Sequence, residues 1–199
     1  MAIIRLNNRA VKDATAFGSI TGLGNLKFIS KQTASSSANV SITSGINSTY
    51  KEYIFYFNNI HPASQSFLGF NFSTDGGSNY NAVKTSTNFR AYHSEANATN
   101  LEYKDGDDIQ QGTGLVLTAG NLGNASDESS SGYLHLFEPS SDTFAKHFIF
   151  RSSSVSSAPA SFDCYVAGYV NTTSAVNGVE FKMSSGNIDS GEITLFGVA

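Results

Sequence analysis

The chain has 199 residues, of which 14% are charged and 40% hydrophobic, and its formal net charge is −4 at pH 7. This length suits one domain, and the low charge content excludes the highly charged composition of a disordered chain. The sequence pI near 5.5 provides no positive field to attract nucleic acid. No apolar run approaches the ~20 residues that span a bilayer. We therefore expect neither a nucleic-acid nor a membrane partner.

Ser, Thr and Asn together supply 63 of the 199 residues, so the polar surface consists mainly of neutral hydroxyl and amide groups. Phe (15) and Tyr (9) supply material for a core, whereas strong helix formers are scarce and Gly numbers 18. This composition disfavours helical bundles and coiled coils.

The first 25 residues carry a basic cluster, Arg5, Arg9 and Lys12, then several glycines, and they lack clear strand alternation. We interpret residues 1–25 as an N-terminal arm that lies on another surface or on a neighbouring subunit. A disordered leader explains the same composition equally well. Residues 11–17 are compatible with a short helical turn. The arm residues expected to contact a capsid or a subunit are Ile3, Ile4, Arg5, Leu6, Arg9, Val11 and Phe17.

From residue 26 onward, apolar and polar residues alternate with the period of two that is typical of β-strands. Tyr53, Phe55 and Phe57, for example, share one face of a run that has Ile54 and Tyr56 on its other face. The predicted strands lie, in chain order, at residues 25–31, 40–42, 53–57, 68–72, 89–93, 115–117, 133–137, 144–150, 162–170, 179–183 and 193–196.

Segments that tolerate positive φ separate many of these strands, at residues 75–77, 104–106, 177–178 and 186–187. Two serine-rich stretches, 126–131 and 152–157, are interpreted as loops because strands flank both. Short aromatic strands with turn chemistry between them predict an all-β fold, a jelly-roll-like antiparallel β-sandwich over residues 26–199. The side chains predicted to form its core are Tyr53/Phe55/Phe57, Leu68/Phe70/Phe72, Phe148/Phe150 and Phe181/Met183.

The sequence offers no pattern that points to a metal site. Its four histidines, His61, His93, His135 and His147, have no metal-ligand spacing. The acidic stretch 105–108 lacks the spaced ligands and closing Glu of a calcium loop, so a solvated turn is the favoured interpretation. We expect no metal and no cofactor.

Nucleophilic chemistry has equally little support. No Gly-x-Ser-x-Gly turn occurs, and Cys164 lies on one strand face with Phe162 and Val166, which fits a buried thiol. No pair of acids is spaced in a way that marks glycoside cleavage. We expect no enzymatic activity, with a polysaccharide depolymerase as the less favoured alternative.

Exposed tyrosines are the remaining candidates for binding. Tyr92, Tyr103, Tyr165 and Tyr169 could stack on sugars or line a subunit contact. Tyrosine is also a common strand residue whose hydroxyl lies at the rim of the sheet and binds no partner. For any single tyrosine this structural interpretation is favoured over a binding role.

Several stretches along the whole chain resemble a family of tailed-bacteriophage virion proteins that is common in marine and cyanobacterial phages. The stretches are Ile4–Val11, Tyr50–Phe55, Asn58–Pro62, Phe89–His93, Leu134–Ser141, and the ending Phe181–Ile188 with Gly191 and Leu195–Gly197. The resemblance implies a structural role in the virion. It brings no catalytic residues, and it leaves open whether the protein lies on the head or the tail.

The resemblance favours one function, and the predicted fold with its exposed tyrosines favours a second. The favoured one is a capsid decoration or cement protein on the head exterior, with the arm contacting the major capsid protein or another virion protein. The alternative is a tail-fibre or other appendage module that binds host surface glycans, since viral capsid and lectin domains share the jelly-roll architecture.

We also expect a homo-oligomer. Charge depletion is typical of surfaces buried at interface centres, and Ile54 and Tyr56 add apolar surface opposite the predicted core face. Composition alone fits a dimer as well as a trimer. The trimer is implied by the resemblance, because phage decoration and fibre proteins commonly lie on three-fold axes.

Overall fold

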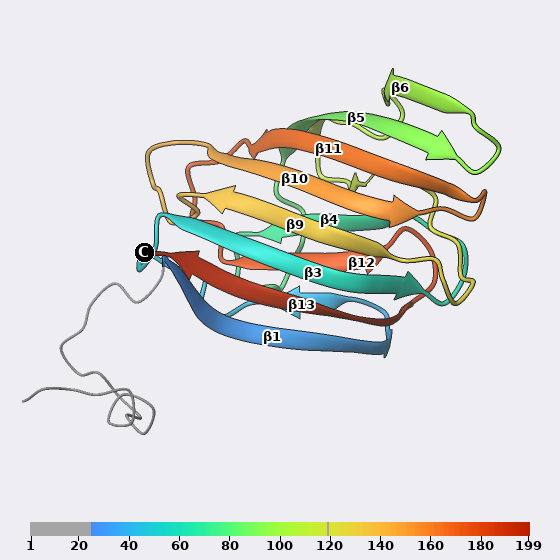
Figure 1. Cartoon of the computed structure of the whole chain (residues 1–199). Helices are drawn as coiled ribbons and strands as arrows, with labels where there is room; N and C mark the ends of the chain where they lie inside the picture. Colours follow the sequence, from blue (N-terminus) through green and yellow to red (C-terminus); the bar gives the residue numbers. More distant parts are fainter. Residues whose placement is uncertain (1–24, 119) are drawn as a thin grey trace, which may run out of the picture.

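The computed structural model describes residues 25–118 and 120–199, and these form two β-sheets that pack face to face (Figure 1). The arm contacts expected at Ile3, Ile4, Arg5, Leu6, Arg9, Val11 and Phe17, and the helical turn expected at 11–17, lie outside the described residues. The strands are β1 (Leu26–Ser37), β2 (Val40–Ile42), β3 (Glu52–Pro62), β4 (Leu68–Ser73), β5 (Lys84–Ser94), β6 (Thr99–Tyr103), β7 (Ile109–Gly112), β8 (Val116–Leu117), β9 (Ser130–Phe137), β10 (Lys146–Val155), β11 (Ala160–Val170), β12 (Gly178–Met183) and β13 (Ile188–Val198).

The larger sheet has nine strands in the order β1-β13-β3-β9-β10-β11-β5-β6, with β7 also paired to β5. The smaller sheet has four, in the order β2-β12-β4-β8. Every pairing is antiparallel. Across the described ranges no helix occurs, and hence none that could cross a bilayer.

The strand pairing is that of a jelly roll. β1 pairs with β13, β2 with β12, β3 with β9 and β4 with β8, so that the pairs are nested from the two ends of the domain inward. A long antiparallel hairpin rolled into two sheets gives this nesting. The predicted jelly-roll-like sandwich is therefore confirmed.

Two insertions enlarge this basic arrangement. Strands β5–β7 lie between β4 and β8 in sequence, and strands β10 and β11 lie between β9 and β12. Both insertions extend the larger sheet, which becomes much wider than the smaller one (Figure 1). The wide sheet thus presents an extended surface on the side away from its partner sheet.

The core lies between the sheets and is dominated by phenylalanine. Phe57 stacks on Phe150 at a centroid distance of 5.3 Å, and Phe70 stacks on the same ring at 5.3 Å. All four sets of predicted core side chains are at most 1% exposed, so that prediction is confirmed. The alternation of strand side chains explains this success, since each set lies on the buried side of its strand.

Serine-rich segments were the main error of the sequence prediction. Ser152–Val155, expected as loop, continue β10, and β9 begins at Ser130. The buried hydroxyls of Ser130 and Ser154 hydrogen-bond each other at 2.9 Å, so these serines satisfy one another inside the sandwich.

Polar edge strands were also missed. β6 and β7 contain mostly exposed residues and lack apolar alternation, so periodicity gave no signal for them. In contrast, Phe144, expected to begin a strand, lies in the loop before β10 and is 66% exposed.

Candidate interaction surface

The outer face of the nine-stranded sheet, which points away from the four-stranded sheet, carries a continuous row of aromatic side chains. The strand register aligns one residue from each of eight strands across this face. Five of the eight residues are aromatic, so we call this line the aromatic row. In spatial order its members are Lys31, Thr194, Tyr56, Tyr133, Arg151, Tyr165, Phe89 and Tyr103.

Neighbouring members of the aromatic row contact one another. Phe89 stacks on Tyr165 with centroids 4.9 Å apart and ring planes 4° from parallel. The Arg151 guanidinium lies 4.7 Å from the centroid of the same tyrosine ring, a cation–π geometry. Tyr56 meets Tyr133 edge to face at 6.2 Å. These contacts order the row without covering it, since Phe89 remains 41% and Tyr103 54% exposed.

A second row on the outer face contains five apolar residues and one histidine, and we call it the apolar row. Its exposed large side chains are Phe28, at 64%, and Ile149, at 46%. A contiguous exposed apolar surface of this kind typically marks an interaction site. The apolar row consists of Phe28, Phe196, Ile54, His135, Ile149 and Ala167.

Charges on the outer face are paired across strands. Arg151 donates from Nε to Asp163 Oδ1 at 3.0 Å and from Nη2 to Oδ2 at 2.8 Å. These hydrogen bonds lower the pKa of Asp163, so its carboxyl group stays ionised. The face therefore has little net charge to oppose an identical face. A further cross-strand ion pair on it is Lys31–Glu192 at 2.8 Å, and His135 Nε2 lies 3.0 Å from Glu52 Oε2.

Two depressions lined mainly by polar residues lie on the outer face, where β3 and β10 end and where β11 and β13 begin, at the end of the sheet opposite the C-terminus (Figure 1). One depression of about 450 Å³, here called the serine hollow, is lined by Ser131, Tyr133, Arg151, Ser153, Ser161 and Asp163. A second, of about 520 Å³, here called the histidine hollow, is lined by Asn59, His61, Ser126, Ser129, Asp189 and Ser190.

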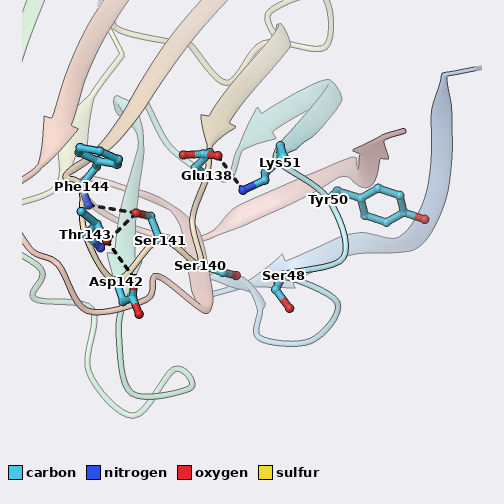
Figure 2. Close-up of a pocket in the computed structure, with 9 residues that line it drawn as sticks. All are labelled: Ser48, Tyr50, Lys51, Glu138, Ser140, Ser141, Asp142, Thr143 and Phe144. Atoms are coloured by element: carbon cyan, nitrogen blue, oxygen red, sulfur yellow. Dashed lines mark hydrogen bonds and ion pairs between the residues drawn. The ribbon is translucent and has the colours of Figure 1, made fainter.

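A third depression, of about 370 Å³ (Figure 2), lies beside the start of β3 and the end of β9, strand ends that lie at the same end of the molecule as the C-terminus (Figure 1). Lys51 and Glu138 form an ion pair of 2.8 Å on its wall. The Ser141 hydroxyl accepts hydrogen bonds from the backbone N–H groups of Thr143 and Phe144, at 3.3 and 3.0 Å. These polar groups are largely satisfied by one another, and the arrangement is that of a well-ordered loop.

Two lysines lie buried on the inner face of the large sheet, on either side of Val170 in one row. Lys84 Nζ donates to the Ala82 carbonyl at 3.0 Å, and Lys146 Nζ donates to the Thr172 carbonyl at 3.0 Å. Burial lowers the pKa of Lys84 to about 8 and also lowers the pKa of Lys146. Lysine is almost never fully buried, so from the sequence both side chains would be expected to be exposed.

The groups considered for nucleophilic or metal chemistry are not brought together. Cys164 is buried, and desolvation raises the pKa of its thiol to about 12, so it is not a nucleophile near neutral pH. Across residues 25–118 and 120–199, no three His, Cys, Asp or Glu side chains are grouped so as to hold a metal ion. In the acidic stretch, Asp108 accepts a hydrogen bond of 2.6 Å from the Tyr103 hydroxyl.

The four candidate tyrosines divide between the two faces of the sheet. Tyr103 and Tyr165 lie in the aromatic row, and Tyr169, which pairs with His147, lies on the same outer face. Tyr92 lies on the inner face instead, where it contacts Phe162 at 5.3 Å. Alternation along the sequence places neighbouring residues on opposite faces of a strand. It does not show that β5, which belongs to an insertion, has side chains partly exposed to solvent on both of its faces.

Comparison with known proteins adds no family to these observations: no family model, curated protein or solved structure matches the chain.

Proposed function

We propose that the chain is a structural protein of a tailed-bacteriophage virion, a capsid decoration protein on the head exterior. Copies assemble as a homotrimer through the apolar row on the outer face of the large sheet. The observation that carries the assembly is the apolar row, in which Phe28 is 64% and Ile149 46% exposed. Exposed apolar surface of this extent favours burial against a partner.

A second copy of the chain is the partner that the charges of this face favour. Arg151 is neutralised by Asp163, and Lys31 by Glu192. Three copies can therefore bring this face together around a three-fold axis without strong repulsion, and depletion of unpaired charge is typical of interface cores. A nucleic-acid partner would need cations available for phosphate, and those of this face are engaged by carboxylates.

The place in the virion rests on the resemblance of the sequence stretches to phage virion proteins, together with an architecture that many viral capsid domains share. The trimer rests on the same resemblance. In this proposal the arm, through Ile3, Ile4, Arg5, Leu6, Arg9, Val11 and Phe17, contacts the major capsid protein, and the sandwich projects from the head.

Gold labelling of intact particles with an antibody against residues 26–199 tests the location directly. We expect label over the head, and label confined to the tail would contradict a decoration role. A second experiment mixes undecorated heads with the full chain or with a chain lacking residues 1–17. Loss of binding on truncation supports the role of the arm, and undiminished binding contradicts it.

A further inference from the structure

The polar end of the outer face has a chemistry that subunit contact does not explain. We propose that the serine hollow and the adjoining histidine hollow form a binding site for an uncharged, hydroxyl-rich glycan. This inference goes beyond the structural role and does not depend on it.

The serine hollow exists because small side chains replace large ones where the outer face is otherwise aromatic. Ser131, Ser153 and Ser161 lie on three neighbouring strands and leave a floor of hydroxyl groups. Tyr133 and Arg151 stand beside them as walls. A planar aromatic wall beside hydroxyl groups suits a sugar ring, which presents an apolar face and a polar rim.

Asp163 gives this hollow an ordered hydrogen-bond acceptor. Its two carboxylate oxygens are held by Arg151, and Oδ2 also accepts from the Tyr165 hydroxyl at 3.1 Å. Its lowered pKa keeps it ionised and able to accept further hydrogen bonds. A preorganised acceptor of this kind binds a sugar hydroxyl with little loss of side-chain freedom.

The two hollows adjoin through a backbone contact. The Asn59 N–H, which lines the histidine hollow, donates to the Ser131 hydroxyl of the serine hollow at 2.9 Å. His61 is fixed in the histidine hollow by a 3.1 Å contact between its Nε2 and the Ala125 carbonyl. Each hollow lies in the usual size range of small-molecule sites, about 300–1,000 Å³, so the pair suits a chain of linked sugars better than one monosaccharide.

The charges of the site select among ligand classes. The Arg151 guanidinium already donates two hydrogen bonds to the Asp163 carboxylate. Asp189, in the histidine hollow, adds a second carboxylate. A phosphate, sulfate or sialic acid would meet these carboxylates without an unengaged cation to offset them. A peptide side chain would find a hydroxyl floor instead of an apolar pocket. An uncharged glycan satisfies the hydroxyls and the tyrosine together.

Saturation-transfer NMR on the full chain tests the proposal, with maltoheptaose, cellohexaose and a mannan oligosaccharide as neutral probes and sialyllactose as the anionic probe. We expect saturation transfer to at least one neutral probe and none to sialyllactose. Absence of transfer to all three neutral probes at millimolar concentration, or transfer to sialyllactose alone, would overturn the proposal.

Two variants locate the site. Tyr133→Ala removes the aromatic wall, and Ser153→Gln fills the floor without changing charge. Each should weaken binding of the responsive neutral probe by roughly tenfold or more. Tyr169→Ala, on the outer face but outside both hollows and both rows, is the matched control and should leave probe binding unchanged. Equal binding by the parent and both site variants, with unchanged melting curves, would show that the hollows are not the site.

Discussion

Phe89 and Tyr165 stack face to face across β5 and β11, with ring centroids 4.9 Å apart, on the outer face of the large sheet. Because Phe89 is 41% exposed, the folded chain gains little from burying it. We expect Phe89→Ala to reduce the free energy of unfolding by only about 1 kcal/mol. Urea unfolding measures this value, and a loss as large as that of a core substitution would contradict an outward-facing position.

Core phenylalanines should behave differently. Phe55 is fully buried and lies 5.9 Å from Phe181 in the opposite sheet. Phe55→Ala should cost about 3–5 kcal/mol, which lowers Tm by roughly 10 °C in a chain of this size. Phe144→Ala, at a residue that is 66% exposed, is the control and should leave Tm nearly unchanged. Differential scanning fluorimetry compares the three proteins, and similar melting of parent and Phe55→Ala would refute the assigned facing of β3.

Close strand packing makes one glycine intolerant of a side chain. A Cβ on Gly132 would lie 2.8 Å from the Ser152 Cα, and its position also conflicts with the Arg151 carbonyl. Backbone atoms cannot give way as a flexible side chain does, so Gly132→Ala should destabilise the fold by about 1–3 kcal/mol. Gly106→Ala, with nothing within 4 Å of the new Cβ, serves as the control. Equal stability of the two variants in urea would show that β9 and β10 are less closely packed.

The buried ammonium group of Lys84 should make stability depend on pH. Burial lowers the pKa of Lys84 to about 8, below the 10.5 of an unburied lysine. Between these values the unfolded chain binds more protons than the folded chain, so the lysine's contribution to stability becomes more favourable as pH rises. Relative to a Lys84→Met variant, the parent should gain about 1 kcal/mol between pH 7 and pH 9.

Urea unfolding of both proteins at the two pH values gives this difference. Comparison with the variant removes the contributions of other groups, including Cys164, whose raised pKa acts in the opposite direction at higher pH. A difference that stays constant over this range would show that Lys84 is charged and solvated in the folded protein.

The sequence predicted the parts of the fold that depend on alternation of aromatic and polar residues. Phe55, Phe70 and Phe150 repeat with period two among their neighbours, and all are buried. Alternation of apolar and polar residues gave no signal where serines lie in the interior. The hydroxyl groups of Ser130 and Ser154 can be buried because they hydrogen-bond each other, and this contact depends on the strand register, which the sequence does not show.

The candidate surface could be predicted only in part. Ile54 and Tyr56 revealed a second apolar face. The aromatic row requires residues from eight strands to align, and non-local register cannot be derived from the periodicity of each strand separately. The serine hollow has the same origin, since Ser131, Ser153 and Ser161 become neighbours only through the pairing of β9, β10 and β11.

Assembly through the outer face is the central structural claim, and the mass of the purified chain in solution tests it most directly. Size-exclusion chromatography with light scattering at micromolar concentration should give about three times the 21.2 kDa chain mass for the parent. The double variant Phe28→Ser/Ile149→Ser, which removes the two exposed large side chains of the apolar row, should give the mass of one chain and still unfold cooperatively, at a Tm lowered by the loss of association. A parent that is a 21.2 kDa monomer, or a double variant that remains trimeric, would contradict the account.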